Sequence, residues 1–284
     1  MSHHFDVSFP LTFAEADGFA ITFTLRKGSQ FRFERGMYVL EGANGVGKST
    51  FLNMLALILG NIGPLAARQA GTIRFDGEAY DGRGFDCYRA AAIRERHFCI
   101  FPQRVFFLPV STRDNYLMLN GSDPEQAKTF SRRQIPDRLS GGQQQRVLME
   151  IVLDPGKPVW FLDEPLANLD VRRRLDFWRL LSQGWRQSVE TLFFIDHLTT
   201  PLIRRHPDFQ PVNVLRTYTE NRGVDGDAEV DFGNIRLYYS RNPEPFFRYQ
   251  MQAVTRRRKR GRSDEPLRLD KDWGASRADA GHKV

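Results

Sequence analysis

Short runs of alternating apolar and polar residues open the chain. Ile21–Leu25 reads Ile-Thr-Phe-Thr-Leu and Gln30–Glu34 reads Gln-Phe-Arg-Phe-Glu, so apolar side chains recur at every second position. This period of two is typical of half-exposed antiparallel strands. The pattern over residues 5–42 therefore predicts a β layer at the beginning of the chain.

Later runs are almost wholly apolar and predict strands that are buried on both faces. They are Met37–Leu40, Pro158–Leu162 and Thr191–Ile195. A helix with few polar residues is expected over Ser49–Leu59, and a short helix around Ala90–Ile93 precedes a strand at His97–Phe101. This order predicts an α/β fold whose doubly wound core contains a mostly parallel sheet.

The apolar density falls between residues 110 and 139, where Asn120-Gly, Asp123-Pro and Pro136 interrupt the pattern. We expect a small helical subdomain here, at about residues 105–142, inserted into the core. Val212–Thr217 and Ile235–Ser240 predict edge strands. A single domain is therefore expected over residues 1–250, and a disordered basic tail over residues 253–284.

Composition narrows the class of protein. The chain has 284 residues, 41% of them hydrophobic, and a net charge of +7. Residues 253–284 hold ten Lys and Arg against five Asp and Glu, so the remaining residues carry only +2 and a chain-wide nucleic-acid surface is disfavoured. Cys87 and Cys99 are too few for a disulfide framework, which fits a reducing, cytosolic compartment.

The sequence also predicts no secretory signal and no membrane span. The first residues, Met-Ser-His-His-Phe-Asp, lack a basic region followed by an apolar one. The run Phe51–Ala67 is shorter than the roughly 20 apolar residues that a bilayer requires, and it contains polar side chains. Membrane association would then depend on a partner.

Residues 42–50, Gly-Ala-Asn-Gly-Val-Gly-Lys-Ser-Thr, match the phosphate-binding loop pattern G-x-x-x-x-G-K-[ST] between a strand and a helix. Glycines allow backbone N–H groups to surround phosphates, and the Lys48 ammonium adds attraction for their charge. Ser49 can place its hydroxyl on Mg²⁺. The motif predicts a nucleoside triphosphate as the ligand.

Two adjacent carboxylates, Asp163 and Glu164, follow the apolar strand that ends at Leu162. Open α/β sheets collect their ligands at this end of the strands. Asp163 is expected to hold Mg²⁺, directly or through water, and Glu164 to act as the general base on the attacking water. The alternative is a helix cap before Pro165.

Residues 139–146, Leu-Ser-Gly-Gly-Gln-Gln-Gln-Arg, resemble the signature sequence of the ATP-binding cassette (ABC) ATPases. By itself this segment could be a helix cap. The resemblance extends through an ordered set: the phosphate loop, Gln103, the signature, Leu162–Pro165, Ala167–Asp170 and His197. It implies the P-loop NTPase fold and hydrolysis of ATP.

The resemblance assigns residues to roles. Glu164, His197 and Gln103 are the catalytic candidates, His197 at the γ-phosphate and Gln103 at Mg²⁺ and the attacking water. Ser49, Gln103 and Asp163 are the candidate metal ligands. The nucleotide contacts are Phe19, Gly42, Asn44, Gly45, Val46, Gly47, Lys48, Ser49, Thr50, Ser140, Gly141, Gly142, Gln143 and Asp170.

Some of these assignments have alternatives or depart from the family pattern. Phe19 is the candidate that stacks on adenine, with Phe13 and Phe23 as rivals. Ala167 stands where Ser is common, and Asp196 precedes His197 where Thr or Ser is common. Neither departure removes a catalytic group.

The resemblance implies a subunit that powers a transporter. Ser140, Gly141 and Gly142 would complete the site of a second cassette, in a homodimer or a heterodimer, and Asp170 would lie at their interface. A separate transmembrane permease would hold the pair on the cytoplasmic face of the membrane. The apolar segment Arg104–Val110 is expected to contact that permease, unless Phe106 and Phe107 pack under the helical subdomain.

The alternative function is a soluble ABC ATPase acting on nucleic acid or another macromolecular complex. Only 91 residues without heptads separate Lys48 from Leu139, and the chain has a single phosphate loop and a single signature. Both facts disfavour this alternative. The basic run Arg256–Arg262 keeps it open, although a solvated tail or attachment to anionic lipid is the favoured explanation of that run.

Overall fold

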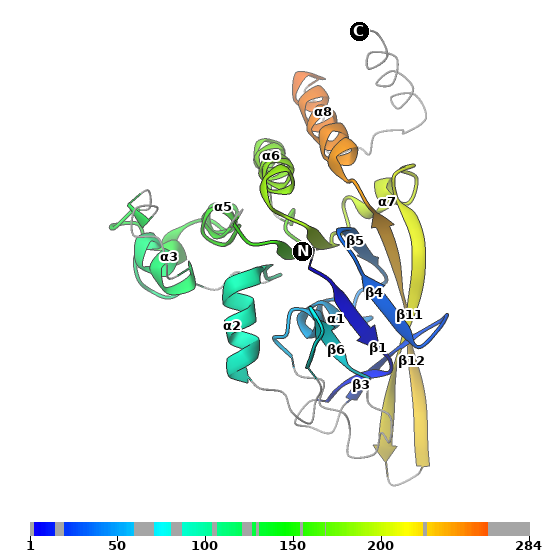
Figure 1. Cartoon of the computed structure of the whole chain (residues 1–284). Coiled ribbons are helices and arrows are strands. Elements are labelled where there is room, and N and C mark those ends of the chain that lie inside the picture. The colour runs from blue at the N-terminus through cyan, green and yellow to red at the C-terminus, as the bar shows by residue number, and fades with distance from the viewer. Residues whose placement is uncertain are drawn as a thin grey trace.

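A computed structural model describes residues 3–14, 20–59, 71–80, 87–103, 107–120, 127–128, 131–153, 156–167, 169–223 and 226–260. The strands form two sheets (Figure 1). The smaller contains, in spatial order, β4 Gln30–Phe33, β1 Phe5–Ser8, β6 Ile73–Phe75 and β7 Glu78–Tyr80. The larger contains β2 Leu11–Ala14, β3 Ala20–Leu25, β11 Gln210–Gly223, β12 Gly226–Ser240, β5 Gly36–Glu41, β10 Thr191–Ile195, β9 Val159–Asp163 and β8 Phe98–Phe101.

The larger sheet is divided by strand direction. The strands β5, β10, β9 and β8 are parallel, while β12, β11, β3 and β2 continue the same sheet in antiparallel pairs. The prediction of edge strands at Val212–Thr217 and Ile235–Ser240 is wrong, because both segments lie inside the sheet between β3 and β5. Their polar alternation arises because one face of this antiparallel half is exposed.

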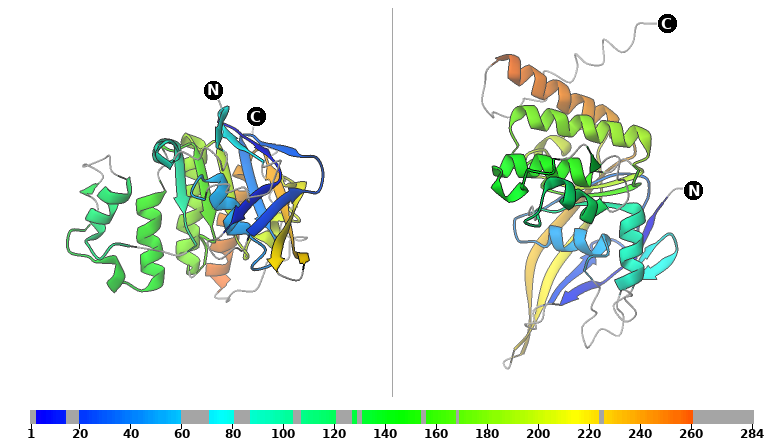
Figure 2. Two further views of the ribbon diagram at one scale, coloured as in Figure 1. Left: turned by 90° about the horizontal axis from the view of Figure 1, so that it is seen from below. Right: turned by 90° about the vertical axis from the view of Figure 1, so that its left-hand side faces the viewer.

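Helices cover both faces of the parallel half, α1 and α2 on one face and α5 and α6 on the other. The helices of the described residues are α1 Lys48–Leu55, α2 Cys87–His97, α3 Thr112–Asn120, the 3₁₀ helix η1 Pro136–Arg138, α5 Gly141–Val152, α6 Val171–Gln187, α7 Thr200–Ile203 and α8 Glu244–Arg260. The helices α6 and α8 lie side by side, and α3 packs against α5 to form a helical group at one end of the molecule (Figures 1 and 2).

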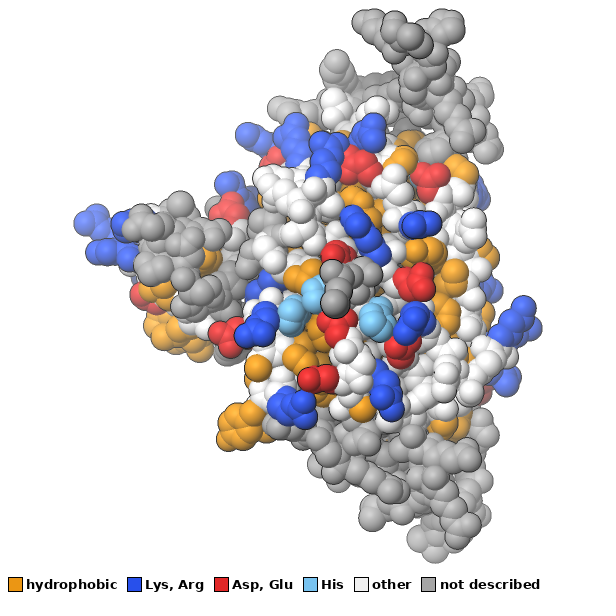
Figure 3. Space-filling view, in the orientation of Figure 1, with side chains coloured by type: hydrophobic (Ala, Val, Ile, Leu, Met, Phe, Trp, Pro, Cys, Tyr) orange, Lys and Arg blue, Asp and Glu red, His pale blue; other side chains and the backbone are white. Residues whose placement is uncertain are grey.

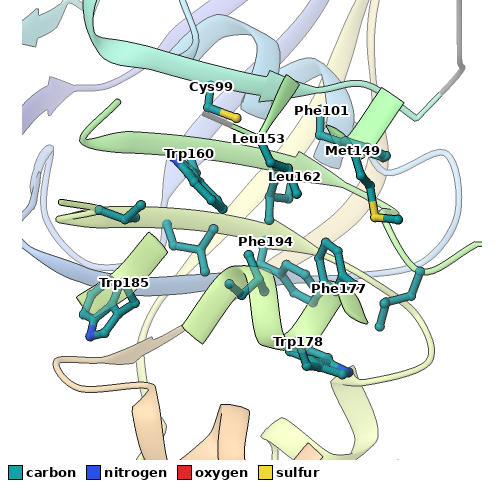
Figure 4. Packing of buried hydrophobic residues seen from close by; sticks show 14 of the residues in the cluster. Cys99, Phe101, Met149, Leu153, Trp160, Leu162, Phe177, Trp178, Trp185 and Phe194 are labelled. Atoms are coloured by element: carbon teal, nitrogen blue, oxygen red, sulfur yellow. The ribbon is translucent and has the colours of Figure 1, made fainter. Parts of the chain in front are cut away.

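The core consists of two hydrophobic clusters, one on each face of the larger sheet. Neighbouring residues of one strand alternate between them: Phe161 faces α1 and the smaller sheet, while Trp160 and Leu162 face α5 and α6. Figure 4 shows the second cluster, in which Phe194 lies near Phe177 and Trp178 of α6. Strands buried on both faces need apolar side chains at successive positions, as the sequence predicted.

The segment after Gln103 is divided between core and surface where the structure describes it. Phe107 is 5% exposed and belongs to the core cluster beneath the helical group, whereas Leu108 is 36% exposed. Residues 104–106 lie outside the described part of the chain. The expectation that Phe107 contacts a partner is therefore wrong, and its large apolar ring packs into the core instead.

The expected disorder from residue 253 is also wrong for the part that the structure describes. The helix α8 continues to Arg260, and Ala253 is 7% exposed. Phe246 and Phe247 anchor this helix because their rings pack against Trp178, with centroids 5.7 and 6.0 Å away. Residues 261–284 of the predicted tail, and the domain boundary drawn at residue 250, remain untested.

Charges are interspersed on the face shown in Figure 3, where acidic, basic and histidine side chains lie close together. The ion pairs near the amino terminus include His3 with Asp76 and Arg32 with Asp6, each at 2.6 Å. Within the described ranges, no helix has the length and apolar character needed to cross a bilayer.

Candidate active site

The carboxyl ends of three parallel strands bring the predicted chemical groups to one edge of the sheet. Ile195 at the end of β10 pairs with Asp163 at the end of β9, and β5 lies on the other side of β10. Directly beyond these ends come Gly42, Glu164 and His197. Parallel strands share a direction, so residues far apart in the sequence converge here.

The phosphate loop leads from β5 into α1 through backbone angles that favour glycine. Gly45 has φ +79° and Gly47 has φ +90°, both in the left-handed region. At Gly47 a Cβ atom would also lie 3.2 Å from the Phe23 ring, so a side chain would be crowded as well as strained. The helix then begins at Lys48, and its first N–H groups remain available for an anion.

Lys48 points back into the loop. Its Nζ donates hydrogen bonds to the carbonyl oxygens of Gly42 at 2.9 Å and Ala43 at 2.8 Å. Burial lowers the pKa of this ammonium group, against the opposing effect of Glu164 and Asp163. A buried cation held by two neutral carbonyls would gain strongly from an anionic phosphate.

Asp163 is 5% exposed and accepts a hydrogen bond from the Ser49 side chain. Burial raises the pKa of its carboxyl, whereas the Ser49 hydrogen bond acts in the opposite direction. Its Oδ1 atom is buried and has no hydrogen-bond partner among the described residues. A carboxylate oxygen without a partner beside a serine hydroxyl suits Mg²⁺, which prefers oxygen ligands.

Glu164 and His197 face each other across the end of the sheet, with His197 Nε2 3.2 Å from Glu164 Oε1. Glu164 has φ +49°, a left-handed conformation that is uncommon outside glycine. Its N–H donates to the carbonyl oxygen of Ile195 at 2.8 Å, which fixes the strained turn. Strain of about 1–3 kcal/mol typically occurs where a catalytic group must be aimed.

Asp196 fixes the turn that carries His197. Its Oδ2 accepts hydrogen bonds from the Thr199 N–H at 2.7 Å and the Thr199 hydroxyl at 2.9 Å. Asp196 is 3% exposed, and burial raises the pKa of its carboxyl while these hydrogen bonds act in the opposite direction. Asp196, which departs from the family pattern, therefore stabilises the turn that carries His197.

The signature segment does not reach the phosphate loop of its own chain. Ser140 is exposed at the start of α5, where its N–H donates to Gln143 Oε1 at 3.0 Å. Among the described residues, no hydrogen bond or ion pair joins Ser140 to the loop. Asp170 begins α6, where its side chain accepts from the Arg173 N–H at 2.9 Å, and this side chain stays 59% exposed.

Of the remaining candidates, the structure describes Gln103 but not Phe19. Gln103 is exposed just beyond β8, at the same edge of the sheet. Phe19 lies outside the described residues, so its stacking on adenine stays a prediction. Its rival Phe23 is fully buried and packs against Phe51 at a ring-centroid distance of 5.4 Å, which assigns it to the core.

The structure also brings unpredicted residues to the site. A cavity of about 570 Å³ is lined by the predicted residues Gly42, Lys48 and His197 and also by Glu41, Arg204, Asn234 and Arg236. Asn234 and Arg236 lie on β12, which pairs with the strand leading into the phosphate loop. No sequence signal links residues some 200 positions apart, because strand register is a tertiary property.

The sequence of this chain is similar to those of known proteins. A family model described as ABC transporter matches residues 26–167, half of the chain. The thiamine import ATP-binding protein ThiQ of Vibrio parahaemolyticus is 30% identical over 222 residues, which cover 71% of this chain and 86% of the relative. ThiQ of Salmonella choleraesuis is 30% identical over 190 residues, covering 61% and 75%.

Two solved structures are similar in fold. A dimeric ATP-binding cassette in a post-hydrolysis state with ADP and Pi has a TM-score of 0.52 and 20% identity, covering 68% of this chain and 88% of that one. An ATP-binding subunit of an ABC transporter has a TM-score of 0.51 and 18% identity, covering 74% and 85%. They confirm the predicted P-loop α/β fold.

Proposed function

The chain belongs to the ABC transporter family, whose ATP-binding subunits hydrolyse ATP to drive transport, and we propose residue roles and an assembly for it. The observation that carries the proposal is the convergence of Lys48, Asp163, Glu164 and His197 at one edge of the sheet. These groups supply a phosphate-binding cation, a metal ligand, a base and a polar group that positions it.

In the proposed site the loop residues Gly42, Asn44, Gly45, Val46 and Gly47, with Ser49 and Thr50, surround the phosphates through their N–H groups. Lys48 leaves the carbonyl oxygens of Gly42 and Ala43 and binds the β- and γ-phosphates. Phe19 stacks on the adenine. The loss of two neutral contacts is small beside the gain of a full opposite charge in a buried position.

Ser49, Asp163 and Gln103 are the proposed ligands of Mg²⁺. When bound, the ion neutralises charge on the phosphates during transfer. The unpartnered Oδ1 atom of Asp163 supports this assignment, because it provides an acceptor that no described side chain satisfies.

Glu164 is the proposed general base, and His197 holds it in place. Glu164 would accept a proton from the attacking water, which Gln103 helps to orient. The 3.2 Å contact between His197 and Glu164 supports a shared role, since an imidazole there can contact both the carboxylate and the γ-phosphate. Asp196 and Thr199 act as positioning residues for that imidazole.

The proposed active assembly is a head-to-tail pair of cassettes. The signature residues Ser140, Gly141, Gly142 and Gln143 would complete the partner's site, with Asp170 at the interface. A separate permease would span the membrane, with the pair on the cytoplasmic face where ATP is available. Similarity to thiamine import proteins supports import as the direction, and the family match favours transport over action on nucleic acid.

Complementation between two inactive variants tests the assembly. Lys48→Ala removes the phosphate contact, and Ser140→Arg blocks the signature, so each variant alone should lose turnover. A mixed pair then has one site with an intact loop from one chain and an intact signature from the other. We expect an equimolar mixture to recover ATPase activity. If the signature acted within its own chain, no mixture could recover it.

A further inference from the structure

The cavity beside the phosphate loop reaches residues of β12. Its lining includes Lys48 and His197 of the candidate active site together with Asn234 and Arg236 of β12. A second cavity of about 410 Å³ shares Asn234 and Arg236 with the first and continues to Arg26 and Arg216. Basic side chains therefore follow one another from the catalytic groups toward solvent.

Three of these arginines are available for an anion. Arg26, Arg216 and Arg236 are exposed, and none forms an ion pair with a described residue. Arg236 and Arg216 lie on β12 and β11, in the register that pairs Arg236 with Val214 and Arg216 with Asn234, and Arg26 directly follows β3, where its N–H donates to the carbonyl oxygen of Val214 at 2.8 Å. Opposite residues in a sheet lie on the same face, so the three guanidinium groups share one surface.

Besides Asp196, whose carboxylate accepts hydrogen bonds from Thr199, Glu41 is the acidic residue in the wall of this cavity. It is 8% exposed, and its Oε1 atom forms an ion pair with Arg204. Its Oε2 atom is buried and has no hydrogen-bond partner among the described residues. A buried carboxylate oxygen in a basic cavity is an acceptor that requires a donor.

The chemistry of the hydrolysis product fits this combination. In ATP hydrolysis the oxygen of water bonds to the γ-phosphorus, the bond to the bridging oxygen breaks, and ADP takes that electron pair. One proton of the water remains on orthophosphate as a P–OH group, and the other passes to the base and then to solvent. The γ-phosphate of ATP carries no such proton at neutral pH.

We propose that the cavity between the phosphate loop and β12 is a binding site for the orthophosphate product on its way out. Arg236 and the amide of Asn234 bind its charged oxygens, and Glu41 accepts a hydrogen bond from its P–OH group. Arg216 and Arg26 receive the ion next. The proposal rests on ATP hydrolysis by this chain and adds an exit site that selects protonated phosphate.

Sulfate provides the discriminating probe, since it matches phosphate in shape and charge but carries no proton at neutral pH. The full chain, saturated with ADP and Mg²⁺, is titrated with phosphate or with sulfate by calorimetry. We expect phosphate to bind at least about tenfold more tightly than sulfate, because a carboxylate facing an unprotonated anion is left without a donor. Equal affinities would overturn the proposal.

Three variants locate the site. Arg236→Gln should weaken phosphate binding by roughly tenfold or more through loss of a charged hydrogen bond. Glu41→Gln should abolish the preference for phosphate over sulfate, because an amide can donate to either ion. Arg74→Gln, which removes an exposed arginine of β6, is the matched control and should bind phosphate as the wild type does.

Binding of ATP is measured first in every variant, so that failure of the nucleotide site is seen separately. If Arg236→Gln and the control bind phosphate equally well, the product is held only in the phosphate loop and the proposal is overturned. Should Glu41→Gln fail to fold, Arg236→Gln and the comparison of phosphate with sulfate still decide.

Discussion

Glu164 has a left-handed backbone conformation, and its carboxylate contacts His197. Glu164→Gln keeps the size and the backbone but removes the base. We expect turnover to fall by roughly 10²–10⁴-fold while ATP affinity stays within about threefold. Steady-state ATPase assays and nucleotide titration measure the two effects. Glu78→Gln, an exposed acid on β7, is the control, and equal turnover in both variants would contradict the assigned role.

Phe107 and Leu108 are neighbours with opposite environments, at 5% and 36% exposed. Phe107→Ala should lower the free energy of unfolding by about 3–5 kcal/mol, because a buried ring leaves a cavity. Leu108→Ala should have a clearly smaller effect. Urea unfolding of both variants makes the comparison. Similar losses in the two would mean that Phe107 is not a core residue.

The last helix, α8, contributes to folding through its first turns. Phe246 and Phe247 are fully buried against α6, and Glu244 accepts hydrogen bonds from Ser182 at 3.1 and 3.2 Å. A chain ending at Arg260 should therefore keep its melting temperature. A chain ending at Pro243 exposes the face of α6 that includes Trp178, and it should melt at least about 10 °C lower or fail to fold.

Differential scanning calorimetry of these two truncations measures the effect, with the full chain as reference. If the chain ending at Pro243 melts with the full chain, α8 adds nothing to the core. If the chain ending at Arg260 melts early, residues 261–284 contribute stability that the predicted tail would not have.

The sequence predicts individual strands and the phosphate loop better than it predicts which strands pair with one another. The strands β5, β9 and β10 follow from local apolar runs, and the phosphate loop follows from a local motif, so both were predictable. The placement of β12 beside β5 depends on pairing between Leu237 and Leu40, which no local pattern encodes. For the same reason Arg236 and Glu41 could not be connected before the register was known.

Two errors have a common physical source. The prediction for Phe107 rests on the family resemblance and on its apolar neighbours, and the prediction for the segment from Ala253 rests on composition. Neither source indicates burial, because burial depends on which surface of the folded protein lies opposite the segment. For Phe107 that surface is the cluster beneath the helical group, and for Ala253 it is the neighbouring helix α6, which packs against α8.

The stability of the fold should depend on acidity through His206. This side chain is fully buried, and its ring packs against Phe246 at 5.2 Å and Phe209 at 5.9 Å. Burial lowers its pKa below 6.5, although Asp208 acts in the opposite direction. The unfolded chain thus binds a proton more readily than the native one, so stability is complete above pH 6.5 and decreases as pH falls below it.

Melting temperatures measured from pH 7.5 to pH 5.5 check this expectation. The wild type should lose stability over that range, and His206→Gln should lose less. His97, whose pKa is also lowered by burial, supplies a second contribution, so His97→Gln serves as the comparison. Identical pH slopes in the wild type and His206→Gln would contradict the assignment.

The position of β5 has a consequence for how the protein is made. This strand leads into the phosphate loop, yet its two neighbours in the sheet are β10 and β12, which come much later in the sequence. The pairing of β12 with β5 ends at Ser240. A ribosome adds about 5–20 residues per second, so the roughly 200 residues between β5 and β12 take on the order of 10–40 s to synthesise. Its pairing with β10 can form once Ile195 has emerged, but the other edge of the apolar strand Gly36–Glu41 stays unpaired until β12 is made. Messages truncated before β12 leave that edge open, so they should yield aggregates rather than a nucleotide-binding fragment.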